Sequence, residues 1–316
     1  VKFNSKGELF VLDTGAGKVI KVKDGKNEEI AYVDQGLDNL ALNSKDEIFV
    51  SSYSEGSIMK VSENSVEEIL PGGIAHAGGI SVINGNIAIA DVQSVKAYNS
   101  DNGQEAWNYK NTFRVSPIGA NTAISTFNDY LILTSWVDNS LKIMKPNTGE
   151  IVESLEGLNV PVSATKFGYG IAVALDGNGS ITIFNFDGSP SKILADGFEA
   201  PTHVINYEEG LLVSDRGRGE LVKLDPDGTK TIIVDGLDSP EGIAVQGNSI
   251  FVFEGNTGEI KEILGNVITV IGNVMPGSPA QSDLEPPSMI FNGIVTHNNY
   301  LYIAGEVEKS LFRIRL

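Results

Sequence analysis

The sequence predicts an all-β fold, a β-propeller of eight four-stranded blades of about 40 residues each, with seven or six blades as the alternatives. Two observations predict it: a short β-rich run recurs eight times at a nearly constant step, and turn residues divide each repeat into short strands. The steps between successive runs are 39, 39, 44, 40, 40, 39 and 51 residues. The runs are anchored on Val11, Val50, Ile89, Leu133, Val173, Val213, Val252 and Ile303.

Within each repeat the pattern is that of an antiparallel meander. A second alternating run follows the anchor run, as in KVIKV from Lys18 and SITIF from Ser180. Asp-Gly, Asn-Gly or Thr-Gly pairs then lead to a third run, because such pairs supply the positive φ that tight hairpins need. A further short strand precedes the anchor run, as in SPEGIAV at 239–245. Period-two alternation with frequent turns leaves little room for a helix of normal length.

The repeats fill the chain, so we expect a single propeller domain over 1–316. Val1 falls inside the innermost strand of its repeat, and the last repeat stops after its third strand. Because an open ring would leave two sheet edges unpaired, we expect residues upstream of Val1 to complete it. A segment rich in Pro and Gly at 265–288 reads as an insertion that caps one face. The expected blades are approximately 1–35, 36–73, 74–116, 117–159, 160–199, 200–238, 239–288 and 289–316.

Composition narrows the choice of partners. The chain has 41 Asp and Glu against 23 Lys and Arg, a net charge of −18, which disfavours nucleic acid and anionic membrane surfaces. It has no cysteine, which excludes disulfides, thiolate zinc sites and a cysteine nucleophile. No window approaches the roughly 18 apolar residues of a membrane helix. We therefore expect a soluble, extracytoplasmic or secreted protein that does not insert into a membrane.

Several repeats resemble those of known propeller families. SPEGIAVQGNSIFVFEGNTGEIKEI and APTHVINYEEGLLVSDRGRGELVKLDPDG are similar to NHL repeats and to repeats of SMP-30 (gluconolactonase)-like propellers. The likeness extends over the whole chain. Because these are packing motifs, they indicate the fold more strongly than any chemistry.

In a propeller, the loop entering the innermost strand and the loop leaving the second strand open on one axial face, where ligand contacts are expected. Trp136 could stack on a sugar or aromatic ring, or fill the gap between two blades. Arg216 and Arg218 could clamp a carboxylate, or pair with the surrounding acids. The full set of candidate ligand-binding residues is His76, Asn121, Trp136, Ser163, Arg216 and Arg218.

An acid ends the second strand in six of the eight repeats. A residue that every blade repeats more often holds a turn or an interblade hydrogen bond than performs chemistry. We therefore predict a structural role for Asp13, Asp91, Asp176 and Asp215.

The lactonase resemblance implies a divalent cation, Ca, Mg or Mn, at the axis. By that resemblance Glu241 in SPEG, Asn39 in LDNL and Asn292 in FNG would be its ligands, and His203 a proton acceptor for bound water. The chain departs from the family where Thr202 stands in place of an aspartate. Streptogramin lyase-like propellers also use a histidine and magnesium on such a face, but their W-T-E phrasing is missing here.

Two functions follow from these observations. The first is a non-catalytic recognition module that binds a small molecule, a glycan or a protein at the axial face. The alternative is a metal-dependent lactone or ester hydrolase of the SMP-30-like kind.

Overall fold

The computed structural model describes residues 1–23, 25–33, 37–43, 45–52, 57–70, 73–74, 77–91, 94–110, 118–185, 191–275, 293–305 and 310–316, without the side chains of 38, 70 and 77. These residues form eight antiparallel sheets, seven of four strands and one of three, each in sequence order. The helical part is one 3-10 turn, η1, at Asp176–Asn178. The predicted all-β class and the count of eight blades are therefore confirmed. No helix of the described part is long and apolar enough to cross a membrane.

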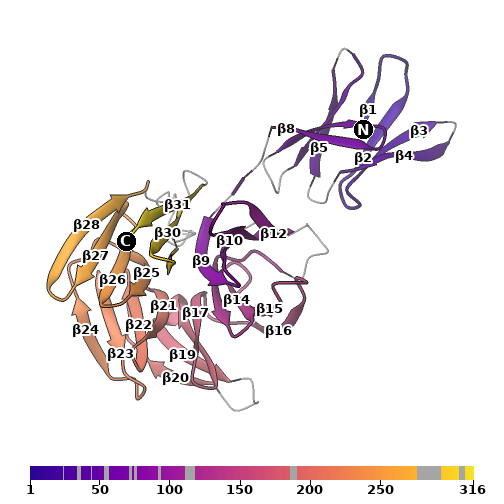
Figure 1. Cartoon of the computed structure of the whole chain (residues 1–316). Helices are drawn as coiled ribbons and strands as arrows, with labels where there is room; N and C mark the ends of the chain where they lie inside the picture. Colours follow the sequence, from indigo (N-terminus) through magenta and orange to yellow (C-terminus); the bar gives the residue numbers. More distant parts are fainter. Residues whose placement is uncertain are drawn as a thin grey trace. The chain divides into compact units, whose positions relative to one another are not determined.

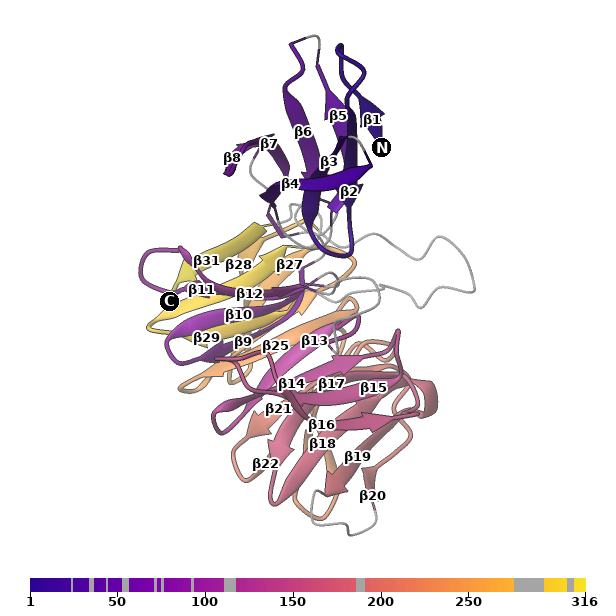
Figure 2. The ribbon, with the colours of Figure 1, turned by 90° about the vertical axis from the view of Figure 1, so that its right-hand side faces the viewer.

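The chain divides into two compact units, which we describe separately. The first, Val1–Ala75 with Lys110–Pro117, holds two sheets, drawn in indigo and purple in Figure 2. Its core includes Phe10, Val19 and Val50, contributed by both sheets. The strands are β1 (Lys2–Phe3), β2 (Leu9–Asp13), β3 (Lys18–Lys23), β4 (Lys26–Tyr32), β5 (Leu37–Leu42), β6 (Ile48–Ser52), β7 (Ile58–Ser62) and β8 (Ser65–Leu70).

The second unit, His76–Tyr109 with Ile118–Leu316, holds six sheets, from purple to yellow in Figure 1. Its first three sheets contain β9 (Ala77–Ile83), β10 (Asn86–Asp91), β11 (Ser94–Asn99), β12 (Glu105–Lys110), β13 (Ala123–Phe127), β14 (Tyr130–Ser135), β15 (Ser140–Met144), β16 (Ile151–Glu156), β17 (Pro161–Phe167), β18 (Gly170–Leu175), β19 (Ser180–Asn185) and β20 (Lys192–Ala195). The other three contain β21 (Pro201–Tyr207), β22 (Gly210–Asp215), β23 (Glu220–Leu224), β24 (Lys230–Val234), β25 (Pro240–Gln246), β26 (Ser249–Glu254), β27 (Glu259–Leu264), β28 (Val267–Asn273), β29 (Ile294–His297), β30 (Tyr300–Gly305) and β31 (Ser310–Arg315).

Within this second unit the first strands of the six sheets form a closed ring. β9, β13, β17, β21, β25 and β29 contact one another in that order, and β29 returns to β9. The Gly293 amide donates a 3.2 Å hydrogen bond to the Gly78 carbonyl at the point of return. A β-carbon built on Gly79 would lie 2.6 Å from the Ala123 Cα, so the approach of β9 to β13 requires glycine.

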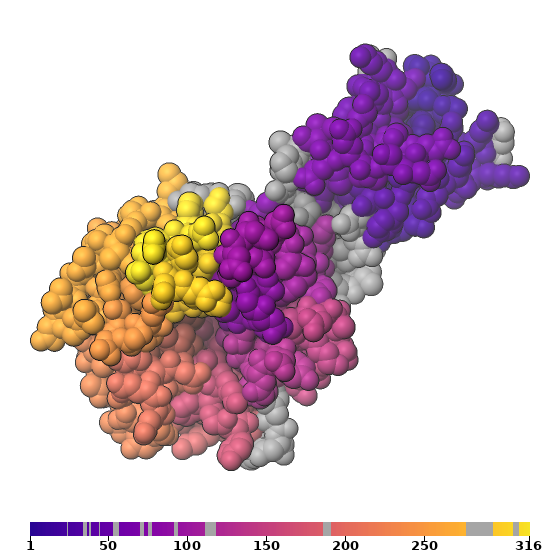
Figure 3. All heavy atoms as spheres, in the orientation of Figure 1, coloured from indigo at the N-terminus to yellow at the C-terminus, as the bar shows by residue number. Residues whose placement is uncertain are grey.

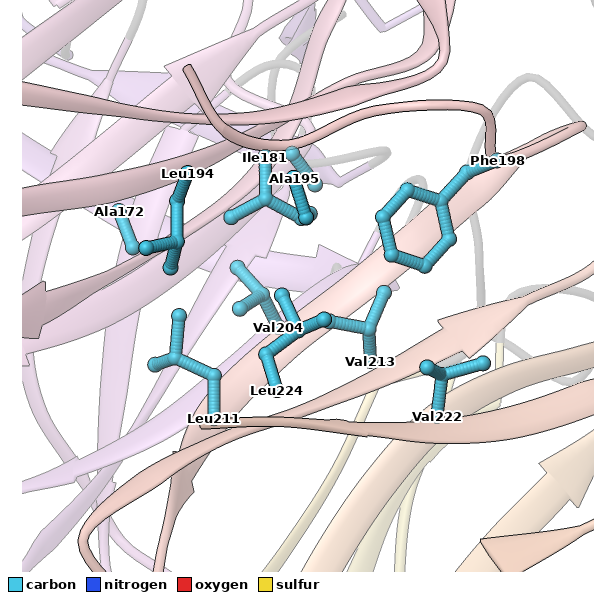
Figure 4. Packing of buried hydrophobic residues seen from close by; sticks show 11 residues of the cluster. Ala172, Ile181, Leu194, Ala195, Phe198, Val204, Leu211, Val213, Val222 and Leu224 are labelled. Atoms are coloured by element: carbon cyan, nitrogen blue, oxygen red, sulfur yellow. The ribbon is translucent and has the colours of Figure 1, made fainter. Parts of the chain in front are cut away.

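Apolar clusters between neighbouring sheets hold the ring together. The cluster in Figure 4 joins β17–β20 to β21–β24. Ala172, Ile181 and Leu211 are completely buried there, while Phe198 comes from the loop before β21. Each sheet buries both faces against its neighbours, so the second strands read as continuous apolar runs and not as alternating ones.

One predicted boundary is corrected. Residues 267–273, assigned above to a Pro- and Gly-rich insertion, form the strand β28. The run VITVI has high β-propensity, and the two-residue connection Gly265–Asn266 turns it back onto β27, with Gly265 at φ +59°. The remainder of the predicted insertion, 276–288, lies outside the described residues. The single domain closed by residues upstream of Val1 stays a prediction.

Candidate functional site at the strand ends of the second unit

The first strands of three neighbouring sheets bulge near their first residue. The register shifts lie between Pro161 and Ser163, Pro201 and His203, and Pro240 and Ile243. Thr202 and Glu241 lie within two of these shifts. A bulge re-aims the side chain of its extra residue, and bulges are common next to binding sites. The same strand ends pair with the ends of the second strands, as Pro201 does with Asp215. The predicted entry and exit positions therefore meet at one end of each sheet.

The buried acid Asp215 holds the loop that enters its own sheet. Its Oδ1 accepts the Ala200 amide at 2.9 Å, and its Oδ2 accepts the Glu199 amide at 3.1 Å. Arg218 is bound in the same place, because its Nε lies 3.6 Å from Asp215 Oδ2 and its Nη2 donates to the Gly197 carbonyl at 3.0 Å. The second arginine of the predicted pair is thus occupied by protein groups.

Other acids at the ends of the second strands, called exit acids below, also have protein partners. Glu254 Oε1 accepts the Asp238 amide at 2.8 Å and pairs with Lys261 at 2.7 Å. Asp91 and Lys96 form a buried ion pair at 3.4 Å. The exposed Asp13, in the first unit, accepts the Ala16 amide at 2.9 Å. These contacts fit the structural role that we predicted for the acid that recurs at the end of the second strand.

Asp176 differs from the other exit acids. It is half-buried at the end of β18, and its carboxylate accepts no hydrogen bond from any described residue. Burial raises the pKa of Asp176, an effect that the charge of Asp215 reinforces and that of Arg216 opposes. Asp176 and Arg216 follow the second strands of neighbouring sheets, and the positive charge of Arg216 acts on the carboxylate of Asp176 from the neighbouring blade.

His203 is buried, whereas a general base has to be accessible to its substrate. It is 8% exposed, and its Nδ1 accepts the Ile243 amide at 2.9 Å. Burial lowers the pKa of His203 to about 4, so the imidazole is neutral near pH 7. Since Nδ1 is an acceptor, the neutral ring carries its proton on Nε2. The residue therefore links β21 to β25.

Two of the three predicted metal ligands lie among the described residues, one in each unit. Glu241 is 3% exposed in β25, with its carboxylate beside Gly255, where an added β-carbon would lie 2.4 Å from Glu241 Oε1. Asn39 belongs to the first unit, where it is exposed and its Oδ1 accepts the Leu40 amide. Asn292 lies outside the described residues. Among the residues that the structure describes, no group of three or more His, Asp or Glu side chains could hold a metal ion.

The remaining ligand-binding candidates have different positions. Ser163 is buried, and its hydroxyl accepts the Val204 amide at 3.2 Å, joining β17 to β21. Asn121 is buried before β13, with its Nδ2 at 3.5 Å from the Gly119 carbonyl. Trp136 is half-buried just after β14. His76 lies outside the described residues.

The sequence did not separate Asp176 from the other exit acids. One signal was available: Asp176 is followed by GNGS, whereas Asp215 is followed by two arginines and Glu254 by a downstream lysine, Lys261. The absence of a nearby cation on its own hairpin is what leaves the Asp176 carboxylate without an ion pair in its own blade.

Comparison with known proteins gives the fold and no further identity. No protein-family model matches the chain, and neither does any curated protein. Among solved structures, the WD40 repeats of RRP9 are similar with a TM-score of 0.52 at 12% identity, covering 85% of this chain and 87% of that one. Virginiamycin B lyase from Staphylococcus aureus has a TM-score of 0.47 at 17% identity, covering 79% and 89%. At 12% identity the likeness to the RRP9 repeats concerns architecture alone, and the described residues make up an all-β chain of eight propeller blades.

Proposed function

We propose that this chain is an NHL- or SMP-30-like recognition module, extracytoplasmic or secreted, that binds a small molecule, a glycan or a protein at the axial face of its second unit. The observation that carries the proposal is Asp176, a half-buried carboxylate that accepts no hydrogen bond from a described residue and on which the charge of Arg216 in the next blade acts. A carboxylate in this state is costly in the unliganded protein, so the site suits a ligand that supplies the missing donor.

The chemistry of the pair indicates the kind of ligand. Asp176 would accept hydrogen bonds from hydroxyl or ammonium groups, and Arg216 would donate to carboxylate, phosphate or hydroxyl oxygens. Trp136 follows a second strand at the same end of its sheet, and an indole is a side chain that stacks on sugars and apolar rings. A polar ligand with both donors and acceptors fits this combination.

Hydrolysis has weaker support. A general base near neutral pH needs a pKa close to the working pH, whereas burial lowers the pKa of His203 to about 4 and its Nδ1 is occupied by a backbone amide. This observation favours binding over catalysis.

A panel of monosaccharides, oligosaccharides and amino acids tests the proposal by thermal shift and calorimetry. At least one member of the panel should raise the Tm of the wild-type chain, and the rise should disappear in Asp176→Asn and in Arg216→Ala. Arg218→Ala is the matched control, because Arg218 is bound to Gly197 and Asp215. A ligand whose Tm shift survives in both test variants would contradict the proposed site.

The hydrolase alternative has its own assay. Glucono-1,5-lactone and p-nitrophenyl acetate are offered to the chain with CaCl2, MgCl2 or MnCl2. Turnover that is lost in Glu241→Gln would overturn the binding proposal in favour of the enzyme. No turnover, with no effect of the three cations on Tm, is the result expected here.

A further inference from the structure

β28 is an exposed and apolar outermost strand. Its residues Val267, Ile268 and Val270 are 63%, 47% and 52% exposed, and Leu264, at the end of β27, is 51% exposed. The strand is last in its sheet, after β27, so no described strand pairs with its outer edge. It lies at the outer rim of the second unit (Figure 1), and the orange atoms around it form part of the outer surface (Figure 3).

The two ends of β28 have different surroundings. Toward its C-terminal end, Ile271 packs on the core shared with the last sheet, and Gly272 leaves room for Ile314. Its first four residues, 267–270, are all exposed, although adjacent residues in a strand point to opposite faces. Both faces of the strand are therefore exposed at residues 267–270.

Charge distinguishes β28 from the other outermost strands. Proteins commonly protect a sheet edge with charged residues, above all lysine. Every other outermost strand of the eight described sheets carries at least one Lys, Arg or Glu, whereas β28 carries no charged residue. The charged strands are β4, β8, β12, β16, β20, β24 and β31.

We propose that β28 is a self-association surface, on which the β28 strand of a second copy of this chain pairs in antiparallel orientation to extend the sheet. A two-fold axis through such a pair places residue i of one strand opposite residue j of the other and j opposite i, so two charged strands would bring like charges close together in the interface. With a net charge of −18, two copies repel over most of their surface, and an uncharged strand offers the least repulsive contact.

Charged residues on β27 have partners within its own sheet. Lys261 pairs with Glu254 at 2.7 Å and Glu259 at 3.6 Å. Glu262 accepts a hydrogen bond from the Ser249 hydroxyl at 2.6 Å, which fixes its carboxylate but leaves its negative charge. The uncharged β28 separates these groups from a second copy that pairs at its outer edge.

The hairpin register identifies the backbone groups that would pair. Leu264 and Val267 flank the two-residue turn and Glu262 faces Thr269, so these are the hydrogen-bonded pairs of β27 and β28. By alternation, the backbone groups of Ile268 and Val270 point away from β27. They are the donors and acceptors available to the second copy.

Sedimentation velocity of the full chain over a wide concentration range measures the association. A wild-type dimer should dissociate at least about tenfold more readily in Ile268→Lys, because each copy would bring a lysine into an edge that has no charge of its own. Ile232→Lys on β24 is the matched control, since Ile232 is 55% exposed on another outermost strand, and its dimer should be unchanged. Val270→Pro removes an outward amide at an edge where proline is tolerated, and it should weaken the dimer too.

Hydrogen exchange supplies the second readout. The amides of Ile268 and Val270 should exchange more slowly as the dimer forms, while those of β24 should not change. A wild-type chain that stays monomeric at the highest concentration overturns the proposal. So does a dimer that persists in both Ile268→Lys and Val270→Pro, or one that Ile232→Lys disrupts equally. Slow exchange of β28 in a monomer would mean that the chain itself covers the strand, which also overturns it.

Discussion

The amide nitrogen of Ile243 donates a 2.9 Å hydrogen bond to Nδ1 of His203, joining the first strands of two neighbouring sheets. The bond needs an unprotonated Nδ1, so protonation of the ring would break it. Burial acts in the same direction, because it disfavours the imidazolium.

This relationship predicts a pH dependence of stability. The folded-state pKa of His203, about 4, lies below the ordinary value of 6.5, so the unfolded chain binds the proton first as the pH falls. The stability that the neutral His203 contributes is therefore complete above pH 6.5 and is lost as the pH falls from 6.5 to about 4. The total loss of unfolding free energy is about 3 kcal/mol. In urea titrations, His203→Asn should lose less stability than the wild type between pH 7 and pH 4.5, and equal slopes would contradict the assignment.

The exit acids should differ in their energetic roles. Asp215→Ala leaves the amides of Glu199 and Ala200 without their acceptor in a buried site and should cost about 2–4 kcal/mol of unfolding free energy. Asp13→Ala, at the same repeat position, removes one exposed turn hydrogen bond and should cost about 0.5–1 kcal/mol. Denaturant unfolding measures both, and equal costs would show that burial does not set the difference.

Replacement of Asp176 by a neutral residue should stabilise the folded protein. Because the folded-state pKa of Asp176 is raised, its ionised form destabilises the protein at neutral pH, and stability from this group increases as the pH falls through that pKa. Asp176→Asn should therefore raise the unfolding free energy at pH 7 while abolishing ligand binding. A variant that is less stable than the wild type at pH 7 would indicate that the carboxylate holds the fold.

The close approach of β9 to β13 predicts strong sensitivity at Gly79. Its added β-carbon would meet backbone atoms, the Ala123 Cα at 2.6 Å and the Ile124 nitrogen at 2.7 Å, which cannot rotate away. Gly79→Ala should cost about 2–3 kcal/mol. An added β-carbon on Gly73 would have no heavy atom of a described residue within 4 Å, apart from its neighbours in the chain. Gly73→Ala should therefore change the unfolding free energy by less than about 0.5 kcal/mol. Thermal unfolding of the two variants compares them directly.

Most of the fold was predictable because a repeated meander imposes the same strand pattern and turn chemistry eight times. The VITVI strand was misassigned because nearby Pro and Gly residues obscured a two-residue turn. The site was harder to predict, since its properties depend on contacts between sheets. The hydrogen bond from Ile243 to His203, and the electrostatic effect of Arg216 on Asp176, join residues 40 positions apart in the chain. Spacing within one repeat contains no information on such pairs.

The central claim is that a ligand enters between Asp176 and Arg216. Crystals of the full chain soaked with a set of monosaccharide and amino-acid fragments test it most directly. The account predicts density for a fragment whose hydroxyl or ammonium group contacts the Asp176 carboxylate and whose acceptor contacts Arg216. Fragments that bind repeatedly at other places while this pair stays unliganded would contradict it.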